Sequence, residues 1–160
     1  MKLYLVRHGD AKMKNDDALR PLSGKGKDEI HKIGSFLSRQ PDIQIQTIYH
    51  SEKLRAQQTA QILFEHLKIS NPITETNQIN PLDDPNIWVD RLVEMDENVM
   101  LVCHLPYVSN LTSLLVYGNE NTQPVKFYTG SMICLKKETT ERWAVSWIVH
   151  PEDISKRPHP

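Results

Sequence analysis

Three short apolar runs, each followed by a stretch with helical spacing, constrain the fold of this chain more than any other feature. The runs span residues 2–6, part of 43–50, and 99–102. Runs of this length and composition are typical of buried strands. Strands that alternate with helices form a mostly parallel sheet covered on both faces. We therefore expect an α/β fold with a mostly parallel central sheet and helices on both faces, in a single domain over 1–154. Residues 155–160 are expected to form a frayed tail.

Each run is followed by an expected helix with recognisable capping residues. Ser23 is the expected N-cap of a helix that continues to about Arg39, and Ser51 that of a helix that continues to about Leu67. Gly118 is the expected C-cap of the helix after the third run. Apolar residues at helical spacing predict the buried faces: Ile30, Ile33 and Leu37, then Ala56, Ala60, Leu63 and Leu67, then Val108, Leu111, Leu114 and Leu115.

Shorter elements are expected between these helices and strands. Residues 10–22 and 80–85 are polar or rich in proline and asparagine, which indicates loops. A short strand is expected near 73–75 and a short helix over 86–95.

The end of the chain has a different character and predicts two more strands, over 131–135 and 142–149. The second is expected to place Trp143, Val145, Trp147 and Val149 on one face, with both tryptophans in the core.

Composition excludes several classes of function. The chain has 160 residues and a formal net charge of −1, from 19 basic and 20 acidic side chains. This balance gives no electrostatic drive toward nucleic acid or a membrane surface. Cys103 and Cys134 have neither metal-site nor disulfide-framework spacing, and no apolar stretch is long enough to span a membrane. We expect a cytoplasmic protein without metal or cofactor, with a monomer favoured.

Arg7-His8-Gly9 directly follows the first strand and is the first candidate for a functional site. Histidine can act as a nucleophile, arginine offers a planar fork of donors to a phosphate, and glycine lets the backbone turn sharply. Arg55 follows the second strand and His104 the third. Because parallel strands end at one edge of a sheet, we expect these residues to converge there as a phosphate pocket.

The sequence resembles the histidine phosphatase superfamily, and within it the small bacterial SixA-type phosphohistidine phosphatases. The resemblance covers nearly the whole chain and rests on the order and spacing of several short motifs. These are Arg7-His8-Gly9-Asp10-Ala11, Arg20-Pro21-Leu22-Ser23 with Gly26, Ser51 through Arg55-Ala56 to Thr59-Ala60, His104-Leu105-Pro106, 127–129 and 147–151.

The resemblance implies a phosphoglycerate mutase-like fold and a phosphatase that passes through a phosphohistidine at His8. Arg7, Arg55 and His104 would complete the phosphate pocket, and Arg20 is a weaker candidate for a further contact. Two departures are visible. Glu52 stands where the superfamily often has proline, and Cys103-His104-Leu105-Pro106 stands where it often has Gly-His-Asn-Pro.

The resemblance also bears on the substrate. Mutases and acid phosphatases of the superfamily carry larger insertions that cover the site and supply a carboxylic acid. Here only about thirty residues separate the second helix from the strand before His104, which leaves room for a minimal lid. An open pocket suits a phosphorylated side chain on another protein, and the expected substrate is the phosphohistidine of a phosphotransfer (HPt) domain in a bacterial signalling relay.

Two alternatives remain open at this level: a phosphatase or mutase acting on a small phosphorylated metabolite, and a non-catalytic module that binds phosphoproteins. A phosphate ester needs a positioned acid. The candidates for such an acid, which the sequence does not distinguish, are Asp10, Asp17, Glu52 and Glu75.

Overall fold

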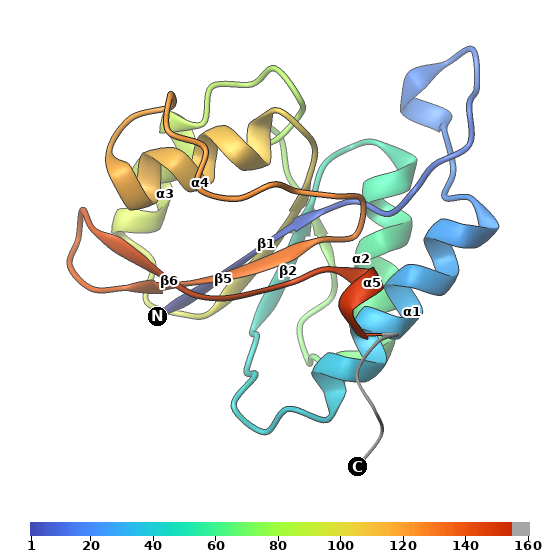
Figure 1. The fold of residues 1–160 in the computed structure, drawn as a ribbon, viewed down its shortest axis with the longest axis horizontal. Coiled ribbons are helices and arrows are strands. Elements are labelled where there is room, and N and C mark those ends of the chain that lie inside the picture. The colour runs from blue at the N-terminus through green and yellow to red at the C-terminus, as the bar shows by residue number, and fades with distance from the viewer. Residues whose placement is uncertain (155–160) are drawn as a thin grey trace.

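A computed structural model describes residues 1–154 and shows one six-stranded mixed sheet. The strand order is β3-β2-β4-β1-β5-β6. The first four strands of this order are parallel to one another, whereas β5 runs antiparallel to both of its neighbours, β1 and β6 (Figure 1). The expected mostly parallel central sheet is confirmed, with strands β1 (Lys2–Arg7), β2 (Thr47–His50), β3 (Thr74–Glu75), β4 (Val99–Cys103), β5 (Met132–Lys137) and β6 (Trp143–Val149).

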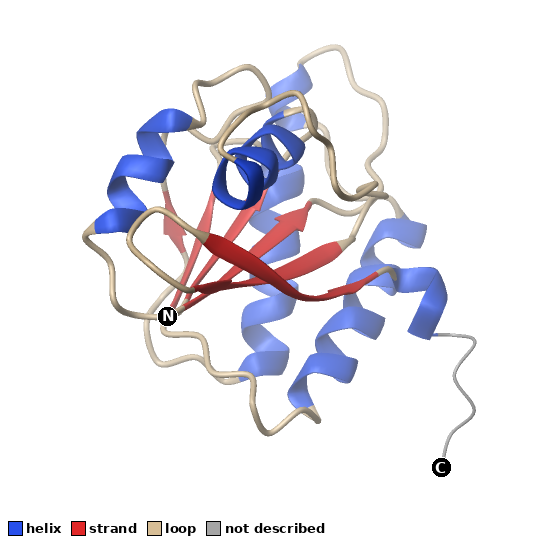
Figure 2. Cartoon of the chain, turned by 60° about the vertical axis from the view of Figure 1, so that its left-hand side comes forward, coloured by secondary structure: helices blue, strands red, loops and turns tan. Residues whose placement is uncertain are grey.

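Helices cover both faces of the sheet. Figure 2 shows one group of helices on one side of the sheet and a second group on the opposite side. The first group consists of α1 (Gly24–Ser38), α2 (Leu54–Leu67) and α5 (Pro151–Ile154), and the second of α3 (Asn86–Val93) and α4 (Tyr107–Tyr117). A single 3-10 turn, η1 (Asp17–Leu19), lies in the loop between β1 and α1.

The alternation of side chains along each strand divides the core into two layers. On β1, Tyr4 and Val6 pack under α1 and α2, whereas Leu3 and Leu5 pack under α3 and α4. All four are fully buried. Because both faces of the central strands are covered, these strands read as continuous apolar runs.

Most expected helix ends are confirmed. The Oγ of Ser23 accepts a hydrogen bond from the backbone N–H of Gly26 at the start of α1, and Gly118 ends α4 in the left-handed region at φ 75°. The cap predicted for α2 was wrong. The helix begins at Leu54 with Lys53 in the N-cap position, because the hydroxyl of Ser51 pairs with a histidine on the neighbouring strand.

The expected single face of β6 was also wrong. Cys134 pairs with Trp147 and Leu135 with Val145, so Ser146 is an extra residue in the ladder. A bulge of this kind reverses the alternation of side chains. Trp143 is buried in the layer under α3 and α4, while Trp147 packs in the layer under α1 and α2.

Other differences are small. The short helix α3 ends at Val93 rather than 95, and the turn η1 lies inside the stretch expected to be a loop. The sequence did not indicate α5. The predicted frayed tail, 155–160, lies outside the described residues. No helix within residues 1–154 has the length and apolar character needed to cross a membrane.

Candidate active site

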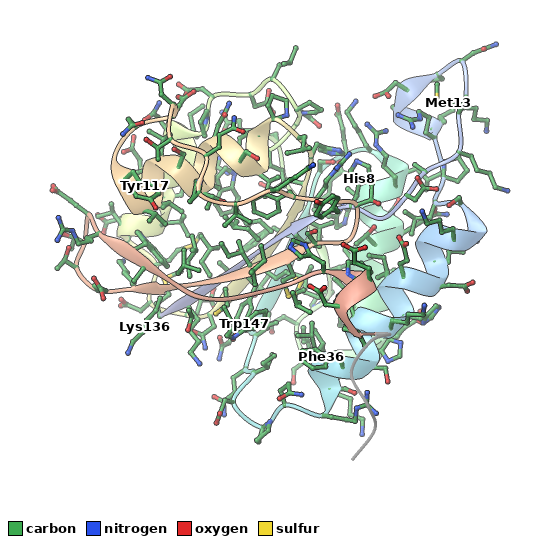
Figure 3. All side chains as sticks on the ribbon, viewed as in Figure 1. His8, Met13, Phe36, Tyr117, Lys136 and Trp147 are labelled. Atoms are coloured by element: carbon green, nitrogen blue, oxygen red, sulfur yellow. The ribbon has the colours of Figure 1, made fainter. Side chains whose placement is uncertain are left out.

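The carboxyl ends of β1, β2 and β4 bring three polar residues together. His8 follows β1, Ser51 follows β2 and His104 follows β4, and these strands are direct neighbours with β4 in the middle. All three side chains are buried. Figure 3 shows His8 at the end of the sheet, below the projecting loop that carries Met13. The convergence expected from parallel strands is therefore present.

The ring of His8 is held by its own turn. Its Nδ1 lies 2.7 Å from the carbonyl oxygen of Gly9, and the backbone N–H of Gly9 donates to the Oγ1 of Thr59 at 3.1 Å. A carbonyl can only accept, so Nδ1 carries the hydrogen and Nε2 carries the lone pair. In this tautomer, Nε2 is the unprotonated ring nitrogen.

The surroundings of His8 keep it neutral. Burial, together with the nearby cations Arg55, Arg7 and Arg20, lowers the pKa of its imidazole to about 4. A hydrogen bond to the Gly9 carbonyl opposes these effects. The net result is that Nε2 has its lone pair available at neutral pH.

His104 faces His8 with its ring centre 4.9 Å away, at an interplanar angle of 52°. Its Nε2 lies 2.6 Å from the Oγ of Ser51, which also accepts a longer contact from the N–H of Lys53. We therefore assign the Ser51 hydroxyl as donor to Nε2, which places the ring hydrogen of His104 on Nδ1.

The Nδ1 of His104 is buried and has no partner among residues 1–154. Burial, followed by electrostatic interactions with His8 and Arg55, lowers the pKa of this ring to about 2. His104 is thus a neutral donor, suited to hydrogen-bonding an oxyanion rather than to neutralising its charge.

Arg55 lies in the first turn of α2 and uses all three nitrogen groups of its guanidinium. Nε donates to Nε2 of His8 at 3.3 Å, and the two terminal nitrogens contact the carbonyl and carboxylate oxygens of Asp17. Thr59, one turn later, donates to the carbonyl of Arg55 and also accepts from Gly9. Thr59 thereby ties the start of α2 to the His8 turn.

Arg7 approaches from β1. Its terminal nitrogen donates to the carbonyl of Phe127 at 3.0 Å, while its buried Nε has no partner among the described residues. Burial lowers the pKa of this guanidinium from its usual high value, although arginine remains charged at neutral pH. The two guanidiniums and the N-terminus of α2 together form a cationic surround for His8.

The family of the chain follows from comparison with known proteins. The model of the histidine phosphatase superfamily (branch 1) matches residues 3–81, which carry Arg7, His8 and Arg55. Just under half of the chain thus matches the histidine phosphatase superfamily. No match was found among curated proteins.

Solved structures of the superfamily show the same fold. The tungstate complex of the protein histidine phosphatase SixA is 24% identical, with a TM-score of 0.87, over 96% of this chain and 99% of that one. A protein described as a SixA phosphohistidine phosphatase from Agrobacterium tumefaciens is 21% identical, with a TM-score of 0.78, over 94% and 97%. The α-ribazole phosphatase from Shigella flexneri is 15% identical, with a TM-score of 0.75, over 91% and 94%. The phosphoglycerate mutase-like α/β fold expected from the resemblance is confirmed.

Arg20 occupies a different position from the other site candidates of this histidine phosphatase fold. Its Nε donates to the carbonyl of Lys12, and a terminal nitrogen lies 3.5 Å from the carboxylate of Asp17. Arg20 therefore braces the loop between β1 and α1, and it acts on His8 through its charge. The structure joins His8, His104, Arg55 and Arg7 directly, and Arg20 only through this loop.

Three residues for which the sequence predicted no role in the site contact its members: Ser51, Lys53 and Thr59. Thr59 stands four residues after Arg55, so helical spacing could have placed both on one face. The pairing of Ser51 with His104 spans 53 positions, and no local pattern could have indicated it.

The four candidate carboxylic acids are now distinguishable. Asp10 accepts from the hydroxyl of Ser23, Glu52 is exposed beside Asn80, and Glu75 is exposed on the edge strand β3. Asp17 contacts Arg55, but hydrogen bonds from Lys53 and the neighbouring cations hold the pKa of its carboxyl well below its usual range. Asp17 is therefore an anion at neutral pH and cannot donate a proton to a leaving group.

Among the described residues, no group of three or more His, Cys, Asp or Glu side chains could hold a metal ion. His31 and His66 contact each other across α1 and α2, with nitrogens 3.0 Å apart. Cys103 is buried in the core, and burial raises the pKa of its thiol.

Proposed function

We propose that this protein is a phosphatase that forms a covalent phosphohistidine at His8 and acts on phosphohistidine in another protein. The observation that carries the proposal is the state of His8. Its Nδ1 is held by the Gly9 carbonyl, and its Nε2 lone pair lies in the cationic surround of Arg55 and Arg7. A pocket that only bound phosphate would not need a nucleophile oriented in this way.

The chemistry proceeds in two transfers. Nε2 of His8 attacks phosphorus, and the bond between phosphorus and the substrate nitrogen breaks, with its electron pair going to the leaving imidazole. Water then attacks the phosphorus of phospho-His8, which releases orthophosphate and regenerates the imidazole. Arg55, Arg7 and the Nδ1–H of His104 stabilise the negative charge on the phosphoryl oxygens during both transfers.

The anionic state of Asp17, whose carboxylate contacts Arg55, favours a phosphohistidine substrate. Imidazole can leave in a form already protonated near neutral pH, whereas an alkoxide leaving group needs a proton from an acid. Asp17, the carboxyl group nearest the cations of the site, is held as an anion.

The setting we propose is a bacterial signalling relay in the cytoplasm, with a phosphotransfer (HPt) domain as the substrate protein. Two neighbours of the same fold support the phosphohistidine part of this proposal, since they are described as SixA phosphohistidine phosphatases.

The proposal is tested by incubating a phosphorylated HPt domain with the protein and with His8→Ala. We expect phosphate release and an acid-labile, base-stable phosphoenzyme with the wild type and neither with His8→Ala. His31→Ala is the matched control, because it removes an exposed histidine on α1 that contacts His66 and none of the site residues named above. Equal phosphate release by wild type and His8→Ala would overturn the proposal.

A substrate panel separates the alternatives. Phosphohistidine protein, phosphotyrosine and phosphoserine peptides and sugar phosphates are compared side by side. Faster turnover of sugar phosphates would indicate a metabolite phosphatase, and phosphate binding without a labelled intermediate would indicate a binding module.

A further inference from the structure

The carboxylate of Asp17 forms ion pairs with the cationic side chains around the phosphate pocket. Its Oδ2 is 2.7 Å from the Nζ of Lys53 and 3.3 Å from a terminal nitrogen of Arg55, and its Oδ1 is 3.5 Å from Arg20. The Asp17 backbone carbonyl also accepts from Arg55 at 2.8 Å. Asp17 therefore supplies a negative charge to the site from η1, in a loop whose residues 12–17 are all exposed.

Lys53 is the second member of this arrangement. It occupies the N-cap position of α2, two residues before Arg55, and its side chain is only 15% exposed. Its charge contributes to the lowered pKa of His104, which places its ammonium group within electrostatic reach of the pocket. Lys53 is thus a cation beside the pocket, and its charge is neutralised by Asp17.

Asp17 also occupies donors of Arg55 that would bind a phosphoryl group. The Nε of Arg55 faces the nucleophilic atom of His8, but both terminal nitrogens are engaged by Asp17. One arm of the planar fork that would hold two phosphoryl oxygens therefore holds the carboxylate of Asp17, and the other holds its backbone carbonyl. An incoming phosphoryl group has to share these donors with the carboxylate or displace it.

We propose that Asp17 is an internal counter-anion which a phosphoryl group displaces from Arg55 and Lys53, and that Lys53, once released, is a further phosphoryl-binding residue. This inference rests on the same pocket as the proposed function and concerns the affinity of that pocket. A phosphoryl dianion can displace a single carboxylate because it carries twice the charge toward the same cations. Asp17 would thus lower the affinity for orthophosphate and promote its release.

The neutral isostere Asp17→Asn tests this directly. The asparagine keeps the backbone contact to Arg55 and an amide oxygen for Lys53, so it removes the charge without removing the positioning. We expect it to tighten orthophosphate binding by roughly 5- to 20-fold at low salt. Lys53→Gln is expected to weaken binding by a similar factor, and both effects should shrink in high salt.

Binding is measured by calorimetric titration of orthophosphate into each folded protein. Asp42→Asn is the matched control, because it makes the same change of charge at an exposed position beyond the far end of α1, and its affinity should equal that of the wild type. Unchanged or weaker binding by Asp17→Asn would overturn the inference, since weaker binding would show that Asp17 serves only to position Arg55.

The experiments distinguish failure of the counter-anion inference from failure of the proposed function. A wild type that forms the phosphoenzyme, together with an Asp17→Asn variant of unchanged affinity, would overturn this inference alone. Tighter binding by Asp17→Asn without any phosphoenzyme in the wild type would support the counter-anion and overturn the proposed reaction. If neither the wild type nor Asp17→Asn binds orthophosphate measurably, the counter-anion inference is overturned, whereas the proposed function is still decided by the phosphoenzyme assay.

Discussion

The Oγ of Ser51 lies 2.6 Å from the Nε2 of His104, and this hydrogen bond joins the ends of the adjacent strands β2 and β4. Both side chains are buried, at 0% and 1% exposure. The contact sets the tautomer of His104 and so decides which ring nitrogen can donate to a phosphoryl oxygen. The same serine would have been free to cap α2, and the helix instead begins without a side-chain cap.

Ser51→Ala should therefore lower the catalytic rate. Without the hydroxyl, Nε2 of His104 is left buried without its donor, and the ring no longer has a fixed tautomer. The loss of such a hydrogen bond corresponds to about 1–3 kcal/mol, so we expect kcat on a phosphohistidine protein to fall by about 10- to 100-fold, with a smaller change in KM.

Ser38→Ala is the control for this variant, because Ser38 is exposed at the end of α1 and bonds only to a nearby carbonyl. Its kcat should equal that of the wild type. A wild-type kcat in Ser51→Ala would show that His104 does not depend on this contact.

The two site histidines should make stability depend on pH. Burial lowers the pKa of His8 to about 4 and that of His104 to about 2, below the value near 6.5 of an unfolded histidine. The unfolded chain therefore binds more protons than the folded protein below about pH 6.5, so stability falls as the pH falls through this window. Between about pH 7 and pH 5 we expect a loss of about 2 kcal/mol from each histidine.

Urea unfolding at the two pH values measures this loss. In His8→Asn the free energy of unfolding should decline by about 2 kcal/mol less than in the wild type over the same interval. An equal decline in the two proteins would mean that His8 is not held neutral by its burial. The interval ends at about pH 5 so that carboxyl groups with ordinary pKa values contribute little.

The start of α1 is packed against the segment that follows His8. A Cβ at Gly26 would collide with the backbone of Asp10, whose nitrogen would lie 2.9 Å away. Asp10 in turn accepts from the backbone and hydroxyl of Ser23. Because backbone atoms cannot yield as a flexible side chain does, Gly26→Ala should cost about 3 kcal/mol of stability and lower the phosphatase rate.

Gly24→Ala is the matched control on the same helix. A Cβ at Gly24 meets nothing within 4 Å, and alanine favours the helix over glycine, so this variant should be neutral or more stable by up to about 1 kcal/mol. Thermal unfolding of the two variants checks the prediction. Equal melting temperatures would contradict the close packing of α1 against Asp10.

Much of this fold was predictable because its signals are local. The spacing of Ile30, Ile33 and Leu37 defines the buried face of α1, and all three are buried as predicted. The apolar strands β1 and β4 are buried on both faces, so their residue type alone identifies them. The order of strands and helices then predicts where His8, Arg55 and His104 meet, since parallel strands end at one edge.

Tertiary structure decided whatever depends on partners distant in sequence. The extra residue Ser146 places Trp143 and Trp147 on opposite faces of the sheet, because pairing with β5 shifts the register where the alternation of β6 suggested continuity. Ser51 pairs with His104 rather than capping α2, since a buried imidazole nitrogen needs a donor and the neighbouring strand end provides one.

Partners distant in sequence also decide the charge states of the candidate carboxylic acids. The sequence alone determined that a histidine and two arginines follow strands of one sheet, but it presented Asp10, Asp17, Glu52 and Glu75 as equivalent acids. Only the folded chain places Asp17 against Lys53 and Arg55, 36 and 38 positions away. The charge state of a carboxyl group depends on which cations surround it in space, and that arrangement exists only once the loop, the helix and the sheet are assembled.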